Sequence, residues 1–122
     1  MITRSLRRIF RKLLYGFYMK IAITSTGNNL KSNVDSRFGR CAYFVIYDTV
    51  SQVTEFIPNP NLNVNEGAGP SSVQLVAKHK VSKVFSGEFG GKVKSLFDSL
   101  NIQMVVIKEN KTIEEIIEMQ NL

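Results

Sequence analysis

The chain has few of the residues that build common covalent and metal sites. Its 122 residues include one Cys, one His and no Trp. A single Cys excludes a disulfide within the chain and any multi-Cys zinc or iron–sulfur site built from one copy. No hydrophobic run approaches the roughly 18 residues of a membrane span. We therefore expect a small soluble protein of a reducing, cytoplasmic compartment, without stable membrane insertion.

The basic charge is concentrated at the N-terminus. Residues 1–18 carry five of the 16 basic residues and no acid, whereas residues 19–122 carry 11 basic and 10 acidic residues. The remaining domain is therefore nearly neutral, and nucleic acid is not a predicted partner. The length fits one domain, and 43% apolar residues exclude wholesale disorder.

Residues 1–18 form a segment apart from the predicted domain at 19–122. Apolar residues recur every three or four positions with arginines between them, as in an amphipathic helix on an anionic membrane surface. A strand-like run begins directly after Met19. The segment is thus interpreted as a dispensable extension or misassigned start, a surface or partner-binding helix, or a core element.

The rest of the chain predicts an α/β fold in which strands and helices alternate. Strands are expected over residues 20–25, 42–48, 52–57, 81–86 and 102–107, the second and third forming a hairpin. Helices are expected from Gly67 to about residue 80, after Gly91 to about residue 100, and after Thr112. Thr112 and Glu115 have the spacing of a capping box, and Ile116 and Met119 are expected to face inward. This order predicts a mixed sheet with right-handed β-α-β crossovers.

Three polar, glycine-rich segments should meet at the carboxyl ends of the strands, where α/β sheets bind ligands. They are residues 33–41, the turn 67–70 and the turn 87–92. Helix N-termini and arginines there would suit an anion. The candidate binding residues are Asn33, Asp35, Arg37, Phe38, Gly39, Arg40, Cys41, Gly67, Gly69, Gly87, Glu88, Phe89, Gly90 and Lys92.

Each part of this candidate site also has a plain structural interpretation. The glycines can serve chain reversal, Arg37 can pair with Asp35, and Cys41 can be a small buried residue. Alternatively, Arg40 could lower the pKa of Cys41 and make its thiolate a metal ligand. The 87–92 turn does not fit a phosphate-binding P-loop, because three residues separate Gly87 from Gly91 and no hydroxyl follows Lys92. No catalytic constellation is present in the pattern.

The ordered segments resemble the dinitrogenase iron–molybdenum cofactor biosynthesis family. The matching residues are Lys20-Ile-Ala-Ile, Ser36-Arg-Phe-Gly-Arg-Cys-Ala-Tyr-Phe-Val-Ile-Tyr-Asp48, Gly67-Ala-Gly-Pro-Ser and Val84-Phe-Ser-Gly-Glu-Phe-Gly-Gly-Lys. The resemblance implies a ribonuclease H-like fold, with about five strands in a mixed sheet and about three helices. It also implies a nitrogen fixation-related role. Many cofactor-binding members have His before Phe-Gly, where this chain has Arg37.

The resemblance implies a non-catalytic binder or carrier of an iron–sulfur or iron–molybdenum-type metallocluster. Cys41 is then the candidate metal ligand, and the partners are proteins that donate or accept the cluster. One Cys cannot supply the four thiolates of an ordinary [4Fe–4S] site, so the chain would act as a monomer or a weak homodimer. Two alternatives are a binding module for a nucleotide or phosphate metabolite, and a regulatory or scaffold domain.

Overall fold

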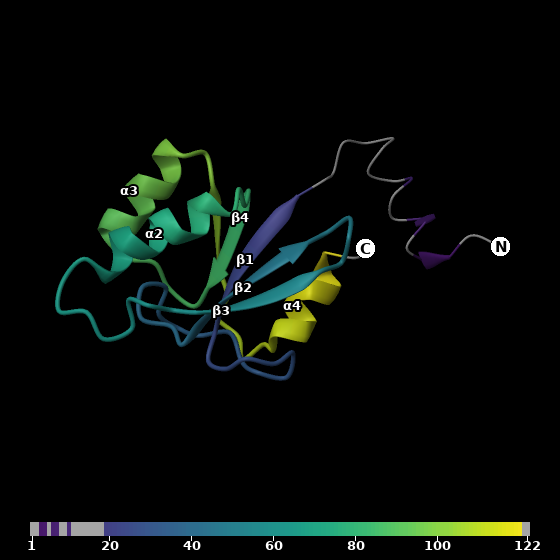
Figure 1. Cartoon of the computed structure of the whole chain (residues 1–122), viewed down its shortest axis with the longest axis horizontal. Coiled ribbons are helices and arrows are strands. Elements are labelled where there is room, and N and C mark those ends of the chain that lie inside the picture. The colour runs from purple at the N-terminus through teal and green to yellow at the C-terminus, as the bar shows by residue number, and fades with distance from the viewer. Residues whose placement is uncertain (1–2, 5, 8–9, 11–18, 121–122) are drawn as a thin grey trace.

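The protein is a five-stranded sheet with helices on both faces (Figure 1). The computed structural model describes Thr3, Arg4, Leu6, Arg7, Phe10 and residues 19–120. The prediction for residues 1–18 therefore lies largely outside the described residues. The strands are β1 (Lys20–Ser25), β2 (Tyr43–Asp48), β3 (Thr54–Pro58), β4 (Lys83–Ser86) and β5 (Gln103–Val106). The helices are α2 (Ala68–Lys78), α3 (Gly91–Ser99) and α4 (Ile113–Met119).

Strand β1 lies at the centre of the sheet, whose order is β3-β2-β1-β4-β5. It pairs antiparallel with β2, which pairs antiparallel with β3 to form the predicted hairpin. On its other side β1 runs parallel to β4, and β4 runs parallel to β5. The predicted α/β class, with five strands in a mixed sheet and three flanking helices, is confirmed. Helices α2 and α3 provide the crossovers that parallel pairing requires.

The two faces of the sheet have separate apolar cores, because successive side chains of a strand point to opposite faces. Ala22 of β1 belongs to the cluster beneath α2 and α3, and Ile21 and Ile23 belong to the cluster beneath α4. In the same way Phe44 faces α2 and α3, while Val45 faces α4. The alternation of β1 and β2 thus fixes which helices cover which face (Figure 1).

Helix α4 begins as predicted, but one residue predicted to face inward does not. Thr112 accepts a hydrogen bond from the Glu115 backbone, and the Glu115 side chain accepts one from the Thr112 backbone, as a capping box requires. Ile116 is buried as predicted, but Met119 is 48% exposed. Met119 lies about 115° around the helix from the middle of the face formed by Ile113, Ile116 and Ile117, and therefore outside that buried face. Among the described residues, no helix is long and apolar enough to cross a membrane.

Candidate functional site

The three predicted segments meet in a groove of about 310 Å³ at the carboxyl ends of β1 and β4. We call it the Arg37 groove. The segment after β1, the start of α2 and the start of α3 each contribute to its wall. Its lining residues are Arg37, Phe38, Gly39, Arg40, Ala68, Gly69, Glu88, Gly90 and Val93. The expected convergence of these segments on one site is therefore found.

Glycines allow the backbones of these segments to touch. A Cβ atom on Gly39 would lie 3.0 Å from the Gly69 nitrogen, and one on Gly87 would lie 2.5 Å from the Ser36 Cα. A Cβ on Gly69 would lie 2.8 Å from the Val93 side chain. At Gly87 a side chain would force two backbone segments apart, at Gly39 it would crowd the start of α2, and at Gly69 it would require Val93 to move, so all three glycines serve close packing. These glycines therefore allow close packing of the three segments and do not serve chain reversal alone.

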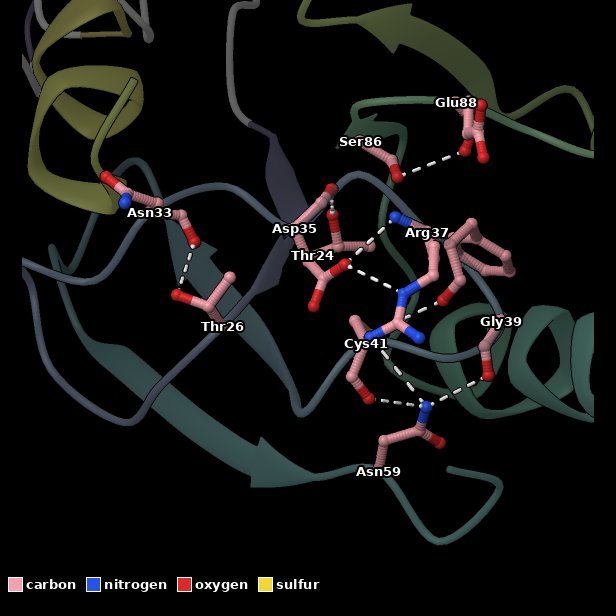
Figure 2. A network of polar contacts seen from close by, with 11 residues as sticks. Thr24, Thr26, Asn33, Asp35, Arg37, Gly39, Cys41, Asn59, Ser86 and Glu88 are labelled. Carbon is pink, nitrogen blue, oxygen red and sulfur yellow. Dashed lines mark hydrogen bonds and ion pairs between the residues drawn. The ribbon is translucent and has the colours of Figure 1, made fainter. Parts of the chain in front are cut away.

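Backbone hydrogen bonds join the segment after β1 to the end of β4. The Gly87 amide donates to the Asp35 carbonyl at 3.0 Å, and Arg37 forms an isolated β-bridge with Glu88. On the other side, the Asp35 amide donates to the Thr24 carbonyl at 2.9 Å, and the Thr24 hydroxyl donates to the Asp35 carbonyl at 2.8 Å. Figure 2 shows Thr24, Asp35 and Arg37 of this network. It anchors Arg37 to two strands of the sheet.

Arg37 is both paired and accessible. Its backbone amide donates to Asp35 Oδ1 at 2.9 Å, and its Nε lies 3.5 Å from the same oxygen. The Asp35 side chain is 7% exposed, whereas the Arg37 side chain is 56% exposed. The buried carboxylate therefore orients the guanidinium (Figure 2), while the Arg37 side chain remains more than half exposed at the groove.

Arg40 binds the loop between β3 and α2. Its Nη1 donates to the carbonyls of Leu62 and Val64 in the loop between β3 and α2. The guanidinium thus fixes that loop against the groove wall. The hypothesis that Arg40 lowers the pKa of Cys41 is wrong.

Cys41 is fully buried beneath the groove, with 0% exposure. Its Sγ donates to the Phe38 carbonyl at 3.4 Å. Burial, with a smaller contribution from the nearby Asp35 carboxylate, raises the pKa of the Cys41 thiol to about 12. A protonated, buried thiol is a poor nucleophile and a poor metal ligand. The geometry therefore favours the structural interpretation of Cys41.

We expect the Cys41 thiol to be protected and to make stability depend on pH. Its folded pKa lies above the ordinary 9.0, so unfolding releases a proton when the pH is between about 9 and about 12. Stability contributed by the protonated thiol is thus complete below pH 9 and falls as the pH rises toward 12. Alkylation of the folded chain at pH 8 should be about a hundredfold slower than in denaturant.

The control for this prediction is Cys41→Ala, which should remove that part of the alkaline decline in unfolding free energy. The two proteins differ only at residue 41, so the difference between the two urea-unfolding series isolates the thiol. Rapid alkylation of the folded chain, together with parallel pH curves, would contradict the burial of Cys41.

Asn59 is a buried residue that holds the wall of the groove together. Its side-chain amide donates to the Gly39 carbonyl at 3.1 Å and to the Cys41 carbonyl at 2.9 Å (Figure 2), and its Oδ1 accepts from the Asn61 amide. Sequence reasoning missed this residue because an Asn between two prolines is typical of an exposed turn. The same reasoning missed Thr24, whose hydroxyl bonds to a carbonyl 11 positions away.

The two helices that begin at the groove lack the usual N-terminal caps. Gly67 and Gly90 are the N-cap residues of α2 and α3, neither makes a side-chain cap hydrogen bond, and neither helix has an acid in its first turn. Gly67 has a φ of 75°, which favours glycine. In contrast, α4 begins away from the groove with Thr112 as its cap and two acids in its first turn. The positive ends of α2 and α3 are thus left available to an anion.

Several predicted site residues lie outside the groove lining. Asn33 forms a β-bridge with Thr112, the cap of α4, and Figure 2 shows it bonded to Thr26 and apart from Arg37. Phe89 is buried and packs against Phe38 with ring centroids 5.8 Å apart. The remaining members of this group are Asp35, Cys41, Gly67, Gly87 and Lys92. Of these, Asp35, Cys41 and Gly87 support the groove from beneath, and Lys92 lies in the exposed first turn of α3.

The groove combines two arginines, one glutamate and two uncapped helix N-termini. In the described part of the chain, no group of three or more His, Cys, Asp or Glu side chains could hold a metal ion. Fold and site together define a small α/β protein with an open groove suited to an anion rather than a preformed metal centre.

The chain belongs to the dinitrogenase iron-molybdenum cofactor family, which matches residues 19–120. Among solved structures it is similar to the apo form of the orange protein from Desulfovibrio gigas. That match has 29% identity and a TM-score of 0.77 over 82% of this chain and 84% of the other. A candidate NifB protein from Thermotoga matches at 30% identity and a TM-score of 0.71, with the same coverage of both chains. A candidate dinitrogenase from Methanocaldococcus jannaschii shares the fold, with a TM-score of 0.58 and 19% identity. That match covers 85% of this chain and 92% of the other. No curated relative matches the chain.

Proposed function

We propose that this protein is a non-catalytic carrier that binds an anionic iron–sulfur or iron–molybdenum-type cluster in the Arg37 groove. The observation that carries the proposal is the convergence of an accessible arginine with two uncapped helix N-termini. Backbone N–H groups and a guanidinium together form a binding surface for sulfide- or oxide-rich anions. Membership of a family defined by a nitrogenase cofactor supports a cluster as the cargo.

In this proposal the cluster keeps its own ligands and is not coordinated by the protein. Cys41 is buried and protonated at neutral pH, so it contributes to packing of the groove floor and not to metal ligation. Glu88 is exposed at the groove and would repel an anion, which limits the affinity. Weak, charge-based retention suits a carrier that receives its cargo from a donor protein and passes it to an acceptor. We place this exchange in the cytoplasm.

The proposal predicts that one charge at the groove decides cluster retention. A preformed iron–sulfur cluster that carries its own thiolate ligands is added anaerobically to the full chain, and bound iron is measured after desalting. Arg37→Gln should weaken retention about tenfold or more, since it removes charge-assisted hydrogen bonds. Lys78→Gln is the matched control, because Lys78 is exposed in the last turn of α2, at the opposite end of that helix.

Cys41→Ala separates charge-based binding from thiolate ligation. Under our proposal this variant retains the cluster and its visible absorption, and retention in all proteins falls as ionic strength rises. Loss of the cluster in Cys41→Ala, with Arg37→Gln unaffected, would contradict the proposed mode and restore Cys41 as a ligand. The folded state of each variant is checked by circular dichroism.

A second candidate function uses the same groove without a metal. Since the described residues include no preformed metal-ligand group, the groove could instead bind a nucleotide or phosphate metabolite. Titration with ADP and with inorganic phosphate tests this alternative. Saturable binding that Arg37→Gln abolishes, in a chain that retains no iron, would replace the cluster by a phosphate ligand.

A further inference from the structure

The two edges of the sheet differ in how they are protected against pairing. Edge strand β3 carries the exposed charge of Glu55 and ends at Pro58. Edge strand β5 has the sequence QMVV, with no charge and no proline. Charged residues and prolines are the usual devices that keep an edge strand from pairing with another chain. Edge β5 lacks both of these devices.

The open hydrogen-bonding groups of β5 can be assigned from its register with β4. The Gln103 amide donates to the Ser82 carbonyl at 3.0 Å, and the Ile107 amide donates to the Ser86 carbonyl at 2.9 Å. Because backbone groups of successive strand residues point to alternate sides, the N–H and C=O groups of Met104 and Val106 point to the open edge. Two residues thus present two donors and two acceptors to a partner strand.

Exposed apolar side chains lie beside this edge. Val106 is 44% exposed and lines a shallow groove of about 130 Å³ together with Met119, which is 48% exposed. Leu100, at the end of α3 and three residues before β5, is 48% exposed. Leu96 of α3 is also exposed, at 37%. Exposed apolar side chains thus flank the uncharged strand, and the groove beside Val106 is also lined by the charged residues that follow β5, Lys108, Glu109 and Lys111.

We propose that β5 pairs antiparallel with β5 of a second copy of this chain. A two-fold axis at Val105 sets Met104 of each copy opposite Val106 of the other, and each such pair exchanges two backbone hydrogen bonds. All four open groups of each strand are then satisfied by the same strand in the second copy. Antiparallel pairing with a second copy is thus self-complementary, as a two-fold interface requires.

The charges next to the strand are compatible with this register. Gln103 falls opposite Ile107 of the second copy, and Ile102 falls opposite Lys108, so that no like charges face each other directly. Since β4 and β5 are parallel, antiparallel pairing of two β5 strands places the two Arg37 grooves at opposite ends of a ten-stranded sheet. The dimer would therefore hold one groove per chain, and a cargo could not be shared between copies.

Two substitutions at Val106 test this interface in the full chain. Val106→Pro removes a donor that points away from β4, a position where an edge strand tolerates proline, and should weaken dimerisation about tenfold or more. Val106→Lys introduces a charge of the kind that blocks edge pairing. Val53→Lys is the matched control, since Val53 is 62% exposed beside the other edge strand.

Sedimentation equilibrium over about a hundredfold range of concentration measures the association of each protein. The expected result is a reversible dimer for the wild type and for Val53→Lys, and monomers for both Val106 variants with unchanged circular dichroism. Hydrogen exchange of the wild type adds a readout free of folding defects, because the Met104 and Val106 amides should gain protection as concentration rises. A monomeric wild type, a dimer that persists in both Val106 variants, or amides that exchange equally at all concentrations would overturn the proposal.

Discussion

Replacing Gly87 by Ala is expected to lower the free energy of unfolding by about 3 kcal/mol, a large value for one methyl group. The added Cβ would lie 2.5 Å from the Ser36 Cα, so that two backbone segments must separate. That separation also strains the bond from the Gly87 amide to the Asp35 carbonyl, on which the position of Arg37 depends. Urea unfolding followed by circular dichroism gives the stability, and iron retention reports the effect on the groove.

Gly91→Ala and Gly90→Ala are the matched controls for this prediction. At both positions an added Cβ meets no atom within 4 Å. Gly91 is the first residue of α3, where alanine should stabilise by up to about 1 kcal/mol because it restricts the unfolded chain and favours the helix. Equal effects at Gly87 and Gly91 would show that the backbone contact with Ser36 is not a source of stability.

Replacing Asn59 by Ala should destabilise the fold by about 2–4 kcal/mol. The substitution leaves the carbonyls of Gly39 and Cys41 without their side-chain donor in a buried position, and it removes the acceptor of the Asn61 amide. An unsatisfied buried polar group costs more than an average hydrogen bond contributes. For a domain of this size the midpoint of thermal unfolding should fall by about 10 °C or more.

Asn61→Ala provides the comparison, because Asn61 is half-buried and its side chain makes one bond, to the Ser72 hydroxyl at 3.2 Å. We expect its cost to stay below about 1 kcal/mol. If Asn59→Ala unfolded at the same temperature as Asn61→Ala, the clamp on the segment 39–41 would have no energetic role. Retained stability with lost iron binding would instead indicate that Asn59 positions the groove without supporting the fold.

The fold could be predicted because its elements are encoded locally. The strand predicted over residues 20–25 has the bounds of β1, and the capping box of Thr112 and Glu115 is formed as expected. Other predicted strands were longer than the observed ones by one to two residues at an end, as in β4, which begins at Lys83 rather than at residue 81. The apolar Val81 precedes the first paired residue of β4, and hydrophobicity alone does not reveal where strand pairing begins. The ribonuclease H-like assignment stays a prediction.

The candidate site was only partly predictable, because its details depend on contacts between distant segments. The convergence of the glycine turns follows from the order of the strands, and the pairing of Arg37 with Asp35 follows from their spacing. The direction of the Arg40 side chain could not be predicted from the sequence, since its acceptors are carbonyls 22 and 24 positions away. The burial of Cys41 and the role of Asn59 likewise depend on how the loop between β3 and α2 folds back over residues 39–41.

The close backbone contacts of Gly39, Gly69 and Gly87 have a kinetic consequence for a carrier. Because these segments are in contact through main-chain atoms, they cannot move apart without breaking that packing. The groove is therefore preorganised before the cluster binds. Under the proposed function, the residence time of a cluster would then be set by Coulomb attraction and not by a conformational step. Transfer of the cluster would then depend on the acceptor protein, whose stronger ligands remove the cluster while the conformation of the groove stays the same.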